Sequence, residues 1–179
     1  MGNPGQPPGN GAVSPLEDKW YALHVRSRHE RRVENSLTGK GYAVLSPFYC
    51  VKRQRPDRVV HVDLPLFPGY VFCNFDWRNR LPILKTPGVT TIVGNRNAGQ
   101  PVEAEEIAGI RAMMDSGRPV QPWPFIRAGQ RVRLRTGPLA DTVGIYVREK
   151  NSSRLILSVT LLQRSVMVEV EQDSVEPLF

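Results

Sequence analysis

The sequence is poor in the residues that build metal centres, disulfide frameworks and hydrolytic active sites. It holds only two cysteines and three histidines among 179 residues. Cys50 and Cys73 lie far apart and form no C-x-x-C pair, so neither a zinc site nor a disulfide framework is expected. The histidines are scattered, and no H-E-x-x-H motif, phosphate-binding loop or Ser/His/Asp order occurs. We therefore expect no catalysis, no metal and no cofactor.

Long apolar runs are also missing. No stretch approaches the roughly 20 residues that a membrane-spanning helix needs. The first residues are rich in Gly and Pro, and they lack the charged start and the apolar core of a secretory signal. We expect residues 1–16 to be a disordered tail and the chain to be cytoplasmic, monomeric and without a membrane partner.

Positive charge, in contrast, is plentiful, with a net charge of +7. Residues 17–118 hold 16 Lys and Arg against 11 Asp and Glu, whereas residues 119–179 hold 8 against 6. A basic excess is typical of proteins that meet a polyanion, and a solvated basic surface explains it equally well. The candidates for facing a nucleic-acid backbone are Arg26, Arg28, Arg31 and Arg32, together with Lys52, Arg53, Arg55 and Arg58.

Residues 17–117 have the pattern of an α+β domain, in which helices cover a mostly antiparallel sheet. The spacing of Ser27 and Glu30 is that of a capping box and predicts a helix from that point. A second helix is predicted after the acidic residues around Glu105, with an apolar stripe through Ile107, Ile110 and Met114. Strands are predicted at 20–26, 42–51, 59–64, 70–75 and 89–93, with a basic hairpin tip at 52–58.

The most informative segment is the Pro-Leu-Phe-Pro-Gly corner before the strand at 70–75. Pro65 and Pro68 fix their φ angles, and Gly69 lets the chain turn without a Cβ clash. The corner would hold Phe67 in a fixed, partly exposed position, which suits a docking surface because little entropy is lost on binding. A bend in the core is the alternative interpretation, and we expect Phe72 and Phe75 to lie in the core.

The pattern changes beyond residue 117. Three prolines and no periodicity predict a semi-stiff linker at 118–126. Residues 127–179 then contain only short strands, which predicts a small all-β barrel. The chain is therefore predicted to hold two domains.

The ordered motifs of both halves resemble the NusG family. The resemblance rests on the Trp20-Tyr21 strand, the Pro-Leu-Phe-Pro-Gly-Tyr-Val-Phe run at 65–72, the Pro-Gly-Val turn at 87–89 and the Gly129-Gln-Arg-Val-Arg-Leu segment. It implies an N-terminal NusG domain and a KOW domain, the latter a five-stranded SH3-like barrel. It also implies a transcription elongation factor that rides on RNA polymerase and suppresses pausing or termination.

The resemblance implies specific partners and site residues. Phe67 and Tyr70 match positions near the pocket for the β′ clamp helices of RNA polymerase, with the β subunit and the upstream DNA nearby. Trp20 and Tyr21 match the strand beside that pocket, and all four residues are the expected polymerase-binding residues. Leu161, Leu162 and Arg164 match the KOW loop at which a small-subunit ribosomal protein or Rho docks.

This chain departs from the housekeeping pattern of that loop, because Leu162 replaces an aromatic residue, Gln163 a glycine and Met167 a proline. The departures put Rho contact in doubt, and the corner sequence and basic hairpin favour a specialised, operon-specific antiterminator. The alternatives are a housekeeping NusG and a ribosomal-type KOW protein that binds RNA.

Overall fold

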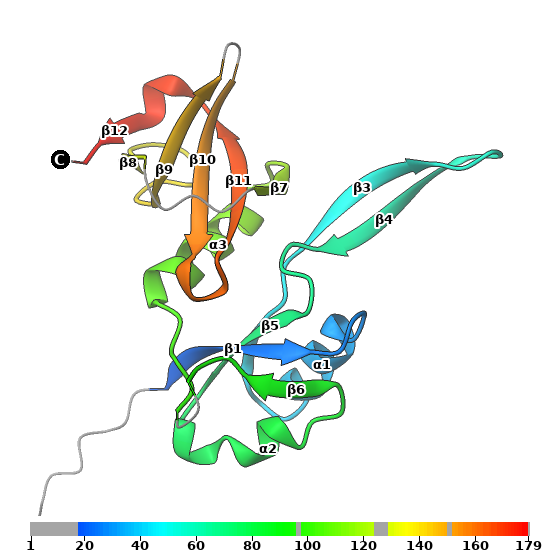
Figure 1. Cartoon of the computed structure of the whole chain (residues 1–179). Coiled ribbons are helices and arrows are strands. Elements are labelled where there is room, and N and C mark those ends of the chain that lie inside the picture. Colours follow the sequence, from blue (N-terminus) through cyan, green and yellow to red (C-terminus); the bar gives the residue numbers. More distant parts are fainter. Residues whose placement is uncertain (1–17, 96–97, 124–128, 150–151, 179) are drawn as a thin grey trace, which may run out of the picture.

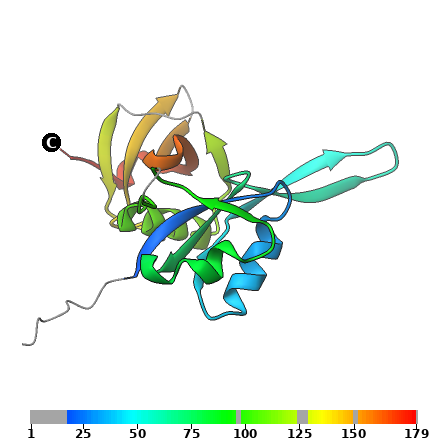
Figure 2. The ribbon, with the colours of Figure 1, turned by 60° about the horizontal axis from the view of Figure 1, so that its bottom comes forward.

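The computed structural model describes residues 18–95, 98–123, 129–149 and 152–178. Figure 1 shows an N-terminal sheet and a C-terminal sheet with helix α3 between them, and a long hairpin that projects from the body. The same arrangement is visible from another side in Figure 2. The segment predicted as a disordered tail, residues 1–16, lies outside the described residues. The fold is α+β in the first half and all-β in the second, as predicted.

The N-terminal sheet has four antiparallel strands in the order β2-β5-β1-β6. Their bounds are Lys19–Val25 for β1, Ala43–Leu45 for β2, Tyr70–Phe75 for β5 and Val89–Ile92 for β6. One face of this sheet packs against helices α1 (Glu30–Thr38) and α2 (Leu81–Leu84), with a 3-10 turn at Trp77–Asn79 before α2. Side chains of alternating residues on β1 and β5 join Val33, Leu37 and Ile83 in that core.

Helix α1 does not begin with the predicted capping box. Its N-cap is His29, which makes no side-chain capping hydrogen bond, and Arg28 has a φ of 64°. A left-handed residue directly after Ser27 is incompatible with Ser27 as the N-cap, because the first helical residues need negative φ. Glu30 therefore becomes the first residue of α1 and not its third.

The predicted strand at 42–51 is divided at Ser46 and Pro47. Its first part is β2, and its second part begins strand β3 (Phe48–Gln54), which pairs with β4 (Val59–Pro65) as a separate two-stranded ribbon. We call this ribbon the β3–β4 hairpin. It leads directly into the Pro corner, because β4 ends at Pro65.

Helix α3 spans Ala104–Asp115 and contacts both β1 and β10. Its buried side chains include Ile107, Ile110 and Met113, whereas Met114 of the predicted stripe is only half-buried. In Figure 2 the helix lies between the two sheets. It therefore links the cores of the two halves.

The C-terminal sheet is antiparallel and has the order β12-β8-β9-β10-β11-β7. The strands predicted beyond the linker are β8 (Gln130–Leu134), β9 (Val143–Glu149), β10 (Ser152–Val159), β11 (Arg164–Val170) and β12 (Val175–Pro177). Two 3-10 turns interrupt them, at Thr160–Leu162 and Gln172–Ser174.

The sixth strand comes from the predicted linker. Val120–Trp123 forms β7 and pairs with β11 at the edge of the sheet. Arg118 strengthens this attachment, because its guanidinium donates to the Glu169 carbonyl at 3.1 Å and to the Glu171 carboxylate at 3.3 Å. Only residues 116–119 separate α3 from β7.

Candidate functional site

The Pro corner is a tight turn held by a hydrogen bond of its own and by one bond each to β1 and α1. The Tyr70 N–H donates to the Phe67 carbonyl at 3.0 Å, and Gly69 has a φ of 82°. Pro and then a positive-φ Gly at the two central positions is the arrangement of a type II turn. The Gly69 carbonyl accepts from the Val25 N–H at 2.8 Å, and the Gly69 N–H donates to the Glu30 carboxylate at 2.9 Å. The corner is therefore fixed to both β1 and α1.

The structure corrects the exposure expected of Phe67. Its side chain is only 1% exposed and packs edge-on against Phe72, with 5.3 Å between ring centroids. Phe72 and Phe75 are also buried, as expected. The turn is hydrogen-bonded to its neighbours, but the Phe67 ring is buried and not presented to solvent.

Phe67 belongs to one continuous apolar cluster whose members come from both halves of the chain, and we call it the closing cluster. From the N-terminal half it contains Ala22, Leu66, Phe67 and Phe72; from α3, Ile107, Ile110 and Met113; and from the C-terminal sheet, Leu155, Leu157, Val166 and Val168 among others. The aromatic residue that the sequence assigns to a partner is thus part of an interior that both halves share.

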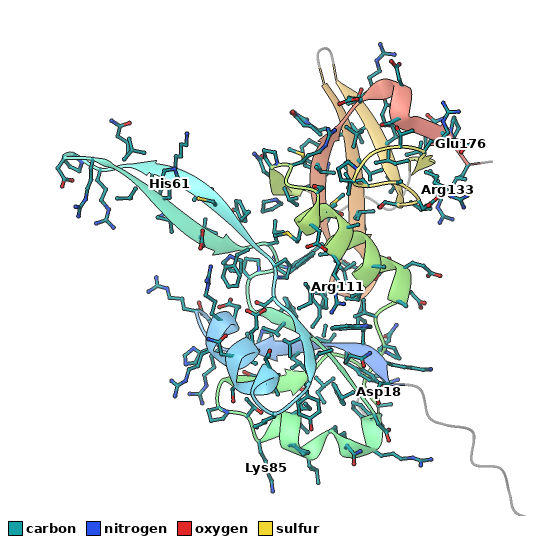
Figure 3. All side chains as sticks on the ribbon, turned by 180° about the vertical axis from the view of Figure 1, so that it is seen from behind. Asp18, His61, Lys85, Arg111, Arg133 and Glu176 are labelled. Carbon is teal, nitrogen blue, oxygen red and sulfur yellow. The ribbon has the colours of Figure 1, made fainter. Side chains whose placement is uncertain are left out.

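Tyr70 and Trp20 lie at the edge of the closing cluster, and each is half-buried. The Arg164 guanidinium lies 5.5 Å from the centroid of the Tyr70 ring, and the Arg111 guanidinium lies 4.7 Å from that of Trp20. Figure 3 shows Arg111 at the junction of α3 with the N-terminal sheet. Cation–π contacts of this kind contribute about 0.5–2 kcal/mol, depending on solvation.

Tyr21 lies on the opposite face of the sheet from these residues. It is 5% exposed, and its ring centroid is 4.7 Å from that of Phe75 and 5.5 Å from that of Trp77. Burial, with a smaller contribution from the Asp76 charge, raises the pKa of Tyr21. Because successive residues of a strand point to opposite faces, β1 separates Tyr21 from Trp20. The structure therefore does not bring Tyr21 together with Phe67 and Tyr70.

The predicted partner loop of the C-terminal half faces the same junction. Leu161 and Leu162 pack against the closing cluster, and Arg164 reaches Tyr70. The Thr160 N–H donates to the Glu106 carboxylate of α3 at 3.1 Å. The predicted partner loop therefore lies against the cluster that contains Phe67, and one of its residues, Arg164, contacts Tyr70.

Gln163 in this loop adopts a left-handed conformation with φ 50° and ψ 46°. This conformation favours glycine and costs a residue with a side chain roughly 1–2 kcal/mol. The predicted partner loop therefore turns at Gln163 through a backbone geometry that a side chain disfavours.

The basic residues fall into two groups in space. Arg26, Arg28 and Arg32 are exposed around the start of α1. Arg31 differs from them, because its guanidinium pairs with the Asp63 carboxylate at 2.6 Å and lies 4.3 Å from the Phe48 ring centroid. It attaches α1 to the base of the hairpin. The second group, on the distal part of the hairpin, is exposed and consists of Lys52, Arg53, Arg55 and Arg58.

Sequence reasoning missed three residues that position this site. Glu30 was assigned to a capping box, although its side chain is buried and binds Gly69. Arg111 carried no signal beyond its place on a helix. Gly109 lies inside α3, where a glycine weakens a helix. A glycine at such a position can indicate that another element packs closely against the helix, and this was the available signal. A Cβ at Gly109 would lie 2.8 Å from Leu157 Cδ1 on β10.

Within residues 18–95, 98–123, 129–149 and 152–178, no group of three or more His, Cys, Asp or Glu side chains is placed to hold a metal ion. None of the helices in the same ranges is long and apolar enough to cross a membrane.

A family profile described as "Transcription termination factor nusG" matches residues 18–111, which include β1, the Pro corner and most of α3. The chain belongs to the NusG family. Curated NusG-family relatives extend the similarity into the second half of the chain. The "Transcription termination/antitermination protein NusG" of Staphylococcus carnosus is 27% identical over 175 residues, covering 89% of this chain and 96% of the relative. The protein of the same name from Staphylococcus aureus is 28% identical over the same shares.

A solved structure is also similar to this chain. The structure titled "Domain interaction in Thermotoga maritima NusG" aligns with 92% of this chain and 99% of its own, at 22% identity and a TM-score of 0.46. At that TM-score the match does not establish a common arrangement of the two halves. The membership of the NusG family places the chain among transcription factors, and that membership rests on the family profile.

Proposed function

We propose that this NusG-family protein binds RNA polymerase through the surface around Phe67, Tyr70 and Trp20 and suppresses pausing or termination. The β′ clamp helices are the proposed contact, with the β subunit nearby. The supporting observation is the closing cluster, because it shows that this face of the N-terminal sheet is apolar and is covered by a separate part of the chain. A face of this kind can exchange one apolar partner for another.

The proposed interaction requires the C-terminal half to leave the N-terminal sheet. Phe67 is 1% exposed, so no partner can contact it while the closing cluster is intact. The same separation would free Leu161, Leu162 and Arg164, which we propose as a site for a small-subunit ribosomal protein or Rho. Polymerase binding would therefore favour binding of the second partner at Leu161, Leu162 and Arg164, because both partners bind the same open state of the protein.

The remaining finer assignments follow from the same proposal. We propose a specialised antiterminator over a housekeeping NusG, because the loop around Gln163, which has a left-handed turn, departs from the housekeeping pattern. Arg26, Arg28 and Arg32 are proposed to face upstream DNA, since they are exposed and lie in the same segment as Val25 and Glu30, which both bind Gly69 of the Pro corner. The proposed setting is the cytoplasm, with the protein as a monomer and without catalytic activity.

The test uses core RNA polymerase and an opened form of the full chain. Gly109→Leu should open the protein, because a side chain there meets Leu157 of β10, and should increase both polymerase affinity and the suppression of pausing in single-round transcription. Phe67→Ala in that background should then weaken binding about thirtyfold, the effect of losing an aromatic anchor worth about 2 kcal/mol. Phe75→Ala is the matched control, because it removes an equally large buried ring from the opposite face of the sheet.

Two results would contradict the proposal in different ways. If neither the wild-type nor the opened protein binds polymerase, the function itself is wrong. If Phe67→Ala binds as tightly as Phe75→Ala, polymerase binding stands but the proposed anchor is wrong.

A further inference from the structure

The β3–β4 hairpin has one apolar and one polar face. Residues paired across the two strands point to the same side, so the register assigns each side chain to a face. One face carries the pairs Tyr49–Leu64, Val51–Val62 and Arg53–Val60. The other carries Cys50–Asp63, Lys52–His61 and Gln54–Val59. In Figure 3 the labelled His61 marks the distal half of this ribbon.

Most of the apolar face lacks a partner within the described residues. Val51, Val60 and Val62 are half-exposed and belong to neither apolar cluster, whereas Tyr49 at the base packs against the closing cluster. Neither edge of the ribbon is joined by another described strand. An isolated two-stranded ribbon is marginally stable in water, and an apolar ribbon face that meets water promotes association. The three valines therefore suit a surface that is covered in a complex.

The charges around this face indicate what covers it. Between residues 52 and 58, the tip carries four cations (Lys52, Arg53, Arg55 and Arg58) and one anion (Asp57). The valines lie between this tip and the base of the ribbon. Among the residue pairs that make up the apolar face, Arg53 is the one cation, and it lies at the end next to the tip. A nucleic-acid backbone would use the tip but would leave three valines in contact with phosphates. A protein surface with an apolar strip would cover the valines, and acidic residues beside that strip would pair with the cations of the tip.

Continuity with the Pro corner favours RNA polymerase as that protein. Strand β4 ends at Pro65, and Leu66 and Phe67 follow it directly in the closing cluster. The apolar face of the hairpin thus runs along the chain into the surface proposed above for RNA polymerase. The hairpin face and the Phe67 surface differ in how accessible they are to a partner. The hairpin projects from the body in Figure 1, whereas Phe67 is buried.

We propose that the apolar face of the β3–β4 hairpin docks on RNA polymerase and makes the first contact, before the C-terminal half leaves Phe67. The proposal rests on the proposed function. It assigns the distal hairpin to a protein partner and its four cations to acidic residues beside the docking strip. Contact at the hairpin would hold the polymerase next to the closing cluster while that cluster opens.

The test compares full-length variants for binding to core RNA polymerase without nucleic acid. The triple variant Val51→Thr, Val60→Thr and Val62→Thr keeps the shape and the β propensity of the ribbon but places hydroxyl groups on its apolar face. We expect it to weaken the binding of the closed protein by about tenfold or more. Val59→Thr is the matched control, because Val59 is 52% exposed on the opposite face. It should leave the affinity unchanged, and both variants should melt as the wild type does.

Each contrary outcome has a separate meaning. If the triple variant binds polymerase as the wild type does, while Gly109→Leu still binds more tightly, the hairpin proposal is wrong and the proposed function stands. If no form of the chain binds polymerase, both are wrong. A third arm measures binding to a short DNA duplex by the wild type and by Arg53→Gln/Arg55→Gln/Arg58→Gln. Arginine-dependent DNA binding with a steep salt dependence, together with unchanged polymerase binding, would assign the hairpin to nucleic acid instead.

Discussion

Substitution of Gly109 should separate the two halves of the protein without unfolding either. Gly109 faces β10 from inside α3, and an ideal Cβ there would lie 2.8 Å from Leu157 Cδ1, 3.6 Å from Leu157 Cδ2 and 3.7 Å from Thr142 Cγ2. Alanine could be accommodated by a small rotation of Leu157. Leucine adds three further carbon atoms at the same place, so the helix and the strand cannot keep their distance.

The structure sets the size of the expected effect. Forcing extra carbon atoms into a packed interface costs about 1–3 kcal/mol. Leucine also favours helix over glycine by about 0.8–1 kcal/mol, which stabilises α3 itself. The penalty therefore falls on the contact between α3 and the C-terminal sheet. A cost of 1–3 kcal/mol raises the open population about 5- to 150-fold, and polymerase affinity should rise by the same factor while the open form remains the minor one.

Polymerase affinity and thermal melting together test this reasoning. Affinity is measured by interferometry with immobilised core polymerase, and the fold of each variant by circular dichroism. Ala104→Leu is the control, because it adds the same side chain to the exposed first residue of α3. A folded Gly109→Leu protein with wild-type affinity would refute the argument that the contact between α3 and β10 keeps Phe67 covered.

Two further predictions concern buried groups. Glu30→Ala should lower the free energy of unfolding by about 1–3 kcal/mol, because the Gly69 N–H loses its acceptor. Glu30→Gln keeps an acceptor oxygen and should lower the free energy of unfolding by less. Equal losses for the two variants in denaturant titrations would contradict this role of Glu30. Burial raises the pKa of Cys73 to about 12, whereas Cys50 is exposed. A thiol-reactive reagent at neutral pH should therefore label one thiol in the folded protein and two in denaturant. In the folded Cys50→Ser variant it should label no thiol. Fast labelling of that variant would show that Cys73 is accessible and would contradict the prediction.

The sequence could predict which residues of a strand share a face, but not what lies against that face. Alternation along β1 separates Trp20 from Tyr21, and the structure confirms that separation. Phe67 is buried in a cluster that includes residues of the C-terminal half, whose position no local pattern encodes. A stiff aromatic turn looks the same in sequence whether water or another sheet covers it.

Two other differences have local causes. The linker prediction rested on its prolines, yet Val120–Trp123 pairs with β11 as an edge strand, where Pro122 needs no N–H donor on the outer side. The capping box at Ser27 had the correct spacing, but the positive φ of Arg28 delays the start of α1. Composition and spacing indicate what a segment can form, whereas the neighbouring strand or turn decides what it does form.

The short connection between α3 and β7 also governs how the protein would close again. Residues 116–119 tether a whole domain to the helix on which it docks, so a released C-terminal half would remain within a few residues' reach of its binding face. Short tethers give effective concentrations in the millimolar range. Any partner of Phe67 must therefore compete with the tethered C-terminal half. After the partner dissociates, the protein can close again without a second molecule.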